Sequence, residues 1–288
     1  MVDFDRIIFY NFYHNGDIFV SKGLVNFIIN NIQAKEYYYF HCNSSKLIQD
    51  IPKIKHIKKL PSNDLEYSGW RIDENTLWCN TWYNSFNKQE FEGCTIQTLF
   101  KVFKRGLKEV INFDLPGEPL DYLPDINFDF FNVDYLFNMI LPLRKIILID
   151  NCNVLSGQSH NFDFNPVIDH ISNQFSDIVF LVTNKNGDDI IKKNVTYCSD
   201  VIDERENNLN EISYLSGFCD ILIGRNSGPH TFCFRKDNLG NRDKTFVCIS
   251  HENFGIVGMV NADFVCSQDY SIEGVINVIE ETIRRKML

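Results

Sequence analysis

Two short stretches of this chain carry residue types that could do chemistry. The first is His14-Asn15-Gly16-Asp17, which follows an apolar run at 6–12 and precedes a stretch with helical periodicity. A carboxylate between a strand and a helix lies at the edge where α/β proteins bind ligands. Asp17 could there act as a general base toward a hydroxyl group, with Gly16 letting the backbone turn. The alternative is that Asp17 only caps the helix.

The second stretch is 215–234, LSGFCDILIGRNSGPHTFCF. The run 220–224 predicts a buried strand, and Pro229 predicts a helix start, where its missing N–H costs nothing. A strand, a turn and a helix start together present backbone N–H groups to an anion. We therefore expect the amides of Gly228, His230 and Thr231 to meet a phosphate. The alternative is an ordinary strand-to-helix connection.

The side chains of this turn allow further contacts. Arg225 would give phosphate a bidentate, permanently charged partner, or else pair with a neighbouring acid. Asn226 and Ser227 would either contact the ligand or shape the turn. The ring of His230 would either bond a ribose or phosphate or pack under the turn. The predicted phosphate-binding set is therefore Arg225, Asn226, Ser227, Gly228, Pro229 and His230.

Aromatic residues mark a third region. All three tryptophans lie at 70–82 among polar residues. Aromatic faces stack on sugar rings and bases, so Trp82 could offer a ligand such a face. The alternative is a loop that its indoles pin to the core. A basic stripe on a predicted helix at 95–111 is either a solvated face or a contact with an anionic membrane surface.

The elements that must position these residues follow from hydrophobic periodicity. Strands are predicted at 6–12, 37–41, 54–60, 145–150, 178–183, 195–198, 220–224, 245–250 and 263–266. Helical stretches alternate with them, and a Pro-rich acidic passage at 114–134 is the candidate linker. This alternation predicts an α/β fold of two separate units. The expected domains are 1–134 and 135–288.

Composition narrows the function. The chain has 288 residues and a formal charge of −10, which argues against nucleic acid as a partner. Nine scattered cysteines without a C-x-x-C pair indicate a reducing, cytoplasmic setting, and no stretch is typical of a signal peptide or a bilayer span. The chain has no P-loop, no G-x-G-x-x-G after the first strand and no zinc-like spacing. We therefore expect neither a metal nor a bound cofactor.

With Asn15-Gly16-Asp17 and LSGFCDILIGRNSGPH in view, the chain resembles glycosyltransferases of the GT-B fold. The nearest group is the heptosyltransferase-like glycosyltransferase family 9. This resemblance implies two Rossmann-like domains that face a cleft, with the acceptor on 1–134 and the donor on 135–288. It puts Gly16, His14 and Trp82 on the acceptor side and the turn at 225–230 on the donor side. The resemblance implies metal-independent, inverting transfer of a sugar from a nucleotide-diphosphate sugar, a co-substrate, to a hydroxyl of a glycan or lipid-linked glycan. The family's base falls on Asp17, and its diphosphate turn on Ser227, Gly228, Pro229 and His230. A cytoplasmic enzyme with peripheral contact at the inner membrane face would fit such an acceptor.

Two other interpretations stay open. A polysaccharide pyruvyltransferase-like enzyme has a similar opening on a related fold, but it should need a denser cluster of basic residues. A non-catalytic protein that binds a nucleotide or glycan is the other. Asn226 stands where the family usually has Asp, which slightly favours this last alternative.

Overall fold

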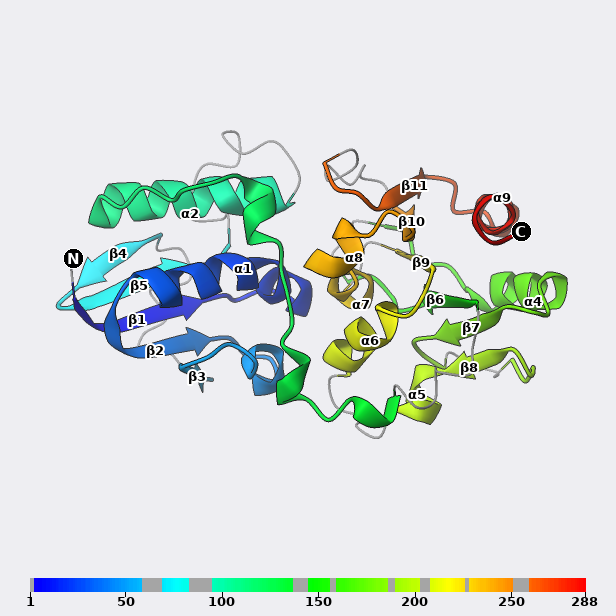
Figure 1. Cartoon of the computed structure of the whole chain (residues 1–288), viewed down its shortest axis with the longest axis horizontal. Coiled ribbons are helices and arrows are strands. Elements are labelled where there is room, and N and C mark those ends of the chain that lie inside the picture. Colours follow the sequence, from blue (N-terminus) through cyan, green and yellow to red (C-terminus); the bar gives the residue numbers. More distant parts are fainter. Residues whose placement is uncertain are drawn as a thin grey trace. The chain divides into compact units, whose positions relative to one another are not determined.

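The computed structural model divides the chain into two compact units, Met1–Phe130 and Phe131–Leu288 (Figure 1). The division falls at 130, whereas the predicted boundary was at 134. The structure describes residues 3–58, 69–82, 95–136, 145–155, 159–185, 190–202, 208–225, 228–250 and 259–288.

Unit 1 is built on a five-stranded sheet in the order β3-β2-β1-β5-β4. The strands are β1 (Phe4–Tyr10), β2 (Ala34–Phe40), β3 (Ile54–Ile57), β4 (Arg71–Asp73) and β5 (Thr76–Asn80). All neighbours are parallel except β4, which runs antiparallel to β5. No strand was predicted at β5, because Thr76 and Asn80 interrupt its apolar pattern, yet every residue of this strand is buried.

Helices cover one face of this sheet, as Figure 1 shows for α1 and α2. Unit 1 contains α1 (Asn15–Asn31), η1 (Ser45–Ile48), α2 (Thr95–Ile111), η5 (Pro119–Tyr122) and η6 (Phe128–Phe130). The predicted helix at 95–111 is confirmed, but α1 begins at Asn15 rather than near 18. Gly16 therefore lies inside the first turn of α1, and the prediction that it makes a separate backbone turn is wrong.

Unit 2 has a six-stranded, all-parallel sheet in the order β11-β10-β9-β6-β7-β8. Its strands are β6 (Ile146–Asp150), β7 (Val179–Val182), β8 (Val195–Tyr197), β9 (Ile221–Arg225), β10 (Thr245–Ile249) and β11 (Asp263–Ser267). Its helices are α4 (Asn165–Gln174), α5 (Cys198–Val201), α6 (Leu209–Ser216), α7 (Gly228–Phe232), α8 (Lys236–Gly240) and α9 (Ile272–Met287). Near-continuous apolar runs such as β6 and β10 are buried along their whole length, as expected of a parallel sheet covered on both faces.

Each sheet has one place where the chain changes direction across it. In unit 1 the chain moves outward from β1 to β2 and β3, then returns to the other side of β1 at β5. In unit 2 it moves from β6 to β7 and β8, then returns beside β6 at β9. Open α/β sheets bind ligands beyond the carboxyl ends of the strands at such switch points. The two edges to inspect are therefore the ends of β1 and β5, and the ends of β6 and β9.

Candidate functional site

Asp17 lies at the switch point of unit 1, in the first turn of α1. One of its carboxylate oxygens, Oδ2, accepts a hydrogen bond from the backbone N–H of His14 at 2.9 Å. The same oxygen lies 3.8 Å from Nδ1 of His14. The side chain of Asp17 is 21% exposed and that of His14 is 60% exposed. Asp17 therefore caps the helix, as one interpretation of the sequence held, and still presents part of its carboxylate to solvent.

Electrostatics make this carboxylate unusually basic. Burial raises the pKa of Asp17 to about 6, and the hydrogen bond and charge of His14 offset only part of that effect. A carboxyl group with a pKa near 6 is mostly ionised at neutral pH and holds a proton better than an ordinary aspartate. General bases work best when their pKa lies near the working pH. Asp17 thus has the properties of a base in addition to those of a cap.

The tryptophans of unit 1 serve the core. Trp82 is 8% exposed, and its ring packs on Tyr13 with centroids 6.0 Å apart. The indole N–H of Trp70 donates to the carbonyl of Asn80, and the ring packs edge-on against Phe103. Trp82 does reach the same sheet edge as His14, because it follows β5 and contacts Tyr13. The prediction that it offers a stacking face to an acceptor is not supported, since burial leaves little of the ring open.

Asp150 organises the switch point of unit 2, and sequence analysis missed it. This residue ends β6 and is 1% exposed. Its Oδ1 accepts from the N–H of Cys152 and from the hydroxyl of Thr183, at 3.0 and 3.1 Å. Its Oδ2 accepts from the N–H of His230 at 3.0 Å. The sequence did contain a sign of this role, because Asp150 is an acidic residue at the end of an apolar strand. A buried carboxylate without partners would cost free energy there, so partners were to be expected.

Arg225 turns into unit 2 rather than toward solvent. It is the last residue of β9 and is 0% exposed. Its guanidinium donates to the carbonyls of Asn151, Cys152 and Phe162 at 2.8, 2.6 and 2.9 Å. The rings of Phe162 and Phe164 lie 5.0 Å from it. The predicted phosphate contact is therefore not supported: Arg225 satisfies the carbonyls of the segment that follows β6.

The ring of His230 follows the second of the two alternatives and packs under the turn. Its side chain is 1% exposed, and its ring packs edge-on against Phe234 with centroids 5.1 Å apart. Gly224 makes room for this ring, since a Cβ there would lie 2.8 Å from it. The backbone N–H of His230, expected to meet a phosphate, donates instead to Asp150. His230 is thus a core residue in both its ring and its amide.

Gly228 and Pro229 form the first turn of α7 and are half-buried. A Cβ at Gly228 would meet no described atom within 4 Å, so this backbone can be approached closely. Asn226 and Ser227 lie outside the described residues. The structure therefore brings Gly228, Pro229, Asp150 and Arg225 to one switch point, with only Gly228 and Pro229 open to a ligand.

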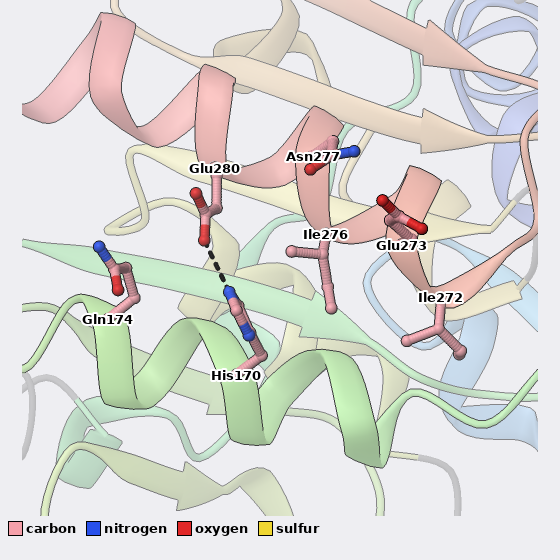
Figure 2. Close-up of a pocket in the computed structure, with 7 residues that line it drawn as sticks. All are labelled: His170, Gln174, Ile272, Glu273, Ile276, Asn277 and Glu280. Atoms are coloured by element: carbon pink, nitrogen blue, oxygen red, sulfur yellow. Dashed lines mark hydrogen bonds and ion pairs between the residues drawn. The ribbon is translucent and has the colours of Figure 1, made fainter.

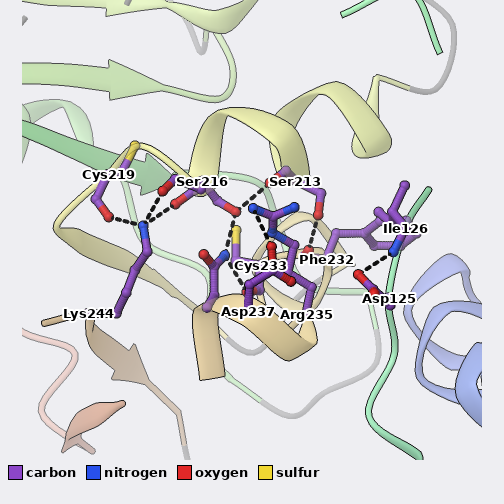
Figure 3. A network of polar contacts seen from close by, with 12 residues as sticks. Asp125, Ile126, Ser213, Ser216, Cys219, Phe232, Cys233, Arg235, Asp237 and Lys244 are labelled. Atoms are coloured by element: carbon purple, nitrogen blue, oxygen red, sulfur yellow. Dashed lines mark hydrogen bonds and ion pairs between the residues drawn. The ribbon is translucent and has the colours of Figure 1, made fainter. Parts of the chain in front are cut away.

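A buried polar network fixes α7 in place (Figure 3). The hydroxyl of Ser213 in α6 donates to the carbonyl of Phe232 at 2.6 Å. Asn238 in α8 donates to the hydroxyl of Ser216 and to the carbonyl of Cys233, at 2.8 and 2.9 Å. Lys244 donates to the carbonyls of Ser216, Gly217 and Cys219 that end α6. These contacts hold a helix of one turn that would not persist alone.

A groove of about 610 Å³ lies between α4 and α9 of unit 2 (Figure 2). His170 and Glu280 bond across it at 2.8 Å, and none of the predicted site residues lines it. Within the described ranges, no three His, Cys, Asp or Glu side chains are grouped to hold a metal ion. No described helix meets the length and apolarity needed to cross a bilayer.

Comparison with known proteins defines the fold. No family model matches the chain, and no curated protein matches its sequence. Among solved structures, the ADP-heptose lps heptosyltransferase II of E. coli matches with a TM-score of 0.59 at 10% identity, over 98% of this chain and 100% of that one. A glycosyltransferase family 9 structure from Veillonella parvula matches with a TM-score of 0.55 at 12% identity, over 99% and 98%.

Two further structures complete the comparison. The E. coli heptosyltransferase WaaC with ADP matches with a TM-score of 0.52 at 7% identity, over 98% of this chain and 99% of that one. TibC, an iron-containing dodecameric glycosyltransferase of E. coli, matches with a TM-score of 0.50 at 12% identity, over 99% of this chain and 78% of that one. The chain thus has the GT-B fold seen in heptosyltransferases, as the sequence resemblance implied.

Proposed function

We propose that this protein is a glycosyltransferase that moves a sugar from a nucleotide-diphosphate sugar to a hydroxyl acceptor. The observation that carries the proposal is the position of Asp17, a partly open carboxylate with a pKa of about 6 at the switch point of unit 1. The GT-B fold of the whole chain supports it. The proposed acceptor is a glycan or lipid-linked glycan in the cytoplasm or at the inner face of the membrane.

In the proposed reaction, the acceptor hydroxyl attacks the anomeric carbon of the donor sugar. Its oxygen forms the new glycosidic bond while its proton passes to the carboxylate of Asp17. The bond between the anomeric carbon and the diphosphate oxygen breaks, and the nucleoside diphosphate leaves with the electron pair. A single displacement of this kind inverts the anomeric configuration. We propose that it needs no metal.

We assign the diphosphate to the switch point of unit 2, over Gly228 and Pro229. The open space at Gly228 supports this assignment, because a phosphate could approach the backbone without a clash. Asp150 and Arg225 would hold the backbone around this site in place without touching the ligand. Both side chains are buried and bonded to the segment after β6. Two of the matched structures involve ADP or an ADP sugar, which makes ADP sugars the first donors to test.

The basic stripe of α2 supports membrane contact only weakly. Lys101 and Lys104 are exposed. Arg105 pairs with Glu109 at 2.8 Å, and Lys108 pairs with Asp114 at 2.8 Å. Exposed ion pairs of this kind are typical of a solvated helix face. We therefore base the proposal on the two switch points and not on this stripe.

The experiment that tests the function is a binding and turnover screen without added metal and with EDTA. Thermal shifts with ADP, UDP, GDP and their sugars identify the nucleobase of the donor, since a ligand that binds the native state raises the melting temperature. Release of the nucleoside diphosphate from the sugar that binds is then measured with Asp17→Asn as control. Binding with turnover that Asp17→Asn abolishes supports the proposal. Binding without turnover would identify a non-catalytic protein, and a response to phosphoenolpyruvate alone a pyruvyltransferase-like enzyme.

A further inference from the structure

Four buried polar residues meet behind Asp17 at the carboxyl edge of the first sheet. They come from four segments: Asn11 follows β1, Ser21 lies in α1, Tyr39 lies in β2 and Thr81 follows β5. None is more than 1% exposed. The hydroxyl of Tyr39 lies 2.8 Å from the hydroxyl of Thr81 and 3.1 Å from that of Ser21. The side-chain amide of Asn11 donates to the hydroxyl of Thr81 at 3.2 Å.

This network holds the chain on both sides of Asp17. The hydroxyl of Ser21 donates to the carbonyl of Ile18 at 2.8 Å, in the turn that directly follows Asp17. The side-chain oxygen of Asn11 accepts from the N–H of Tyr13 at 2.8 Å. Tyr13 precedes His14, whose N–H donates to the carboxylate of Asp17. Tyr39 is the centre of the network, because its hydroxyl joins the α1 side to the β5 side.

Stability alone does not explain why four polar residues are buried here rather than apolar ones. Buried polar groups contribute little net stability even when they are fully bonded, and apolar residues of similar shape often serve as well. A satisfied network does, however, fix one geometry. Burial raises the pKa of Tyr39 to about 12, so its hydroxyl keeps its proton at any working pH. Tyr39 can therefore bridge its neighbours without exchanging protons with Asp17.

We propose that Tyr39 is a positioning residue, whose hydroxyl fixes the first turn of α1 and thereby holds the carboxylate of Asp17 in its half-buried place. This inference rests on the proposed function for its catalytic meaning, but the geometry it describes does not. Tyr39 is not a catalytic residue, since it acts through Ser21 and Asn11 rather than on the acceptor.

Two tyrosines in one strand allow a matched test. Tyr39→Phe removes only the bridging hydroxyl. Tyr37→Phe is the control: Tyr37 is also buried in β2, and its hydroxyl donates to the carbonyl of Ile32 at 2.8 Å. Each variant loses two hydrogen bonds of similar length, because the Tyr37 hydroxyl also accepts from the N–H of Ala34 at 3.1 Å, just as that of Tyr39 bonds to both Thr81 and Ser21. Tyr37, however, bonds at the far end of α1 from Asp17. Thr81→Val, which removes the other bridging hydroxyl, is the second variant in case Tyr39→Phe fails to fold.

The readout is the titration of Asp17, followed by NMR of carboxyl carbons in protein labelled at aspartate, with its signal assigned by its loss in Asp17→Asn. We expect Tyr39→Phe and Thr81→Val to lower the pKa of Asp17 by about half a unit or more, because a loosened first turn admits water. We expect Tyr37→Phe to leave it unchanged. Equal shifts in both tyrosine variants, or no shift in Tyr39→Phe and Thr81→Val, would overturn the proposal.

The second readout is turnover of whichever nucleotide sugar the screen identifies. Tyr39→Phe should lower kcat about tenfold with little change in KM, since a misplaced base affects the chemical step more than binding. Tyr37→Phe should retain the wild-type kcat. If the wild type turns over no nucleotide sugar, the proposed function fails, while the titration still decides whether Tyr39 positions Asp17.

Discussion

The backbone N–H of His230 donates to the carboxylate of Asp150 at 3.0 Å, so the acid at the end of β6 holds the first turn of α7. This bond joins the two strands that flank the switch point of unit 2, because α7 follows β9 directly. It also uses an amide that a helix start would otherwise offer to an anion. Under the proposed function, this leaves the backbone at Gly228 and Pro229 for the phosphate.

Replacing Asp150 with Ala should destabilise the protein strongly. The change leaves the N–H groups of Cys152 and His230 without this acceptor, at a cost of about 3 kcal/mol or more, while the hydroxyl of Thr183 keeps a second acceptor in Asn151. Asp150→Asn should cost less, because its remaining oxygen still accepts. Urea unfolding of both variants measures the loss, and an Ala variant as stable as wild type would contradict the role of this acid.

The substitution Arg225→Lys should cost stability rather than act on a ligand directly. A lysine lacks the planar fork by which two nitrogens of Arg225 reach three carbonyls while the guanidinium lies over the rings of Phe162 and Phe164. We expect a loss of about 2 kcal/mol in the free energy of unfolding. If the variant instead keeps full stability and loses nucleotide affinity in a salt-dependent way, Arg225 contacts phosphate after all.

Gly224 and Gly228 make a matched pair of substitutions to alanine. At Gly224 the new methyl group would lie 2.8 Å from the ring of His230 and 3.0 Å from Cβ of Asp150, so we expect a loss of about 1–3 kcal/mol. At Gly228 it would meet no described atom, so stability should hold. Nucleotide affinity, measured by calorimetry, should nevertheless fall in Gly228→Ala. Unchanged nucleotide affinity in Gly228→Ala would contradict the assignment of the diphosphate to this backbone.

Asp17→Asn should abolish transfer and stabilise the fold at neutral pH. The pKa of Asp17 is about 6 in the folded chain and near 3.8 when unfolded, so its contribution to stability falls as pH rises from about 4 to 6. Asn keeps an acceptor for the N–H of His14 without the buried charge. We expect a gain of about 2 kcal/mol at pH 7.5 and almost none at pH 4, measured by urea unfolding. A loss at pH 7.5 would contradict the raised pKa.

His41 should make the fold sensitive to acid. Its buried ring stacks on His56 with centroids 4.2 Å apart, and burial, with the charge of His56 next, lowers the pKa of His41 to about 3. The unfolded chain binds this proton near pH 6.5, so stability falls as pH drops from about 6.5 toward 3. His41→Phe removes up to one proton from the number taken up on unfolding. The slope of the unfolding free energy against pH should therefore fall by up to about 1.4 kcal/mol per pH unit. An unchanged slope between pH 4 and 6 would refute this.

Much of the fold could be predicted because apolar runs and helical periodicity are local. The strands of unit 2 were placed almost to the residue, since the inner strands β6, β7, β9 and β10 are nearly continuous apolar runs that the parallel sheet buries. Strand β5 was missed, because Thr76 and Asn80 are polar residue types, although both are buried in the fold. Their burial depends on neighbouring strands that the local pattern does not reveal.

The sequence by itself determined the two α/β halves and the two sheet edges, and it singled out Asp17, because strand ends, helix starts and turn residues are set by nearby chain chemistry. Only the tertiary structure decided which polar groups are buried and bonded within the fold. Arg225 and His230 look like ligand contacts in sequence. In the structure, however, Arg225 bonds to carbonyls of the segment after β6, and the N–H of His230 bonds to the carboxylate of Asp150. The physical reason is that a buried hydrogen-bonding group must find a partner, and here those partners lie 63 to 80 residues away along the chain.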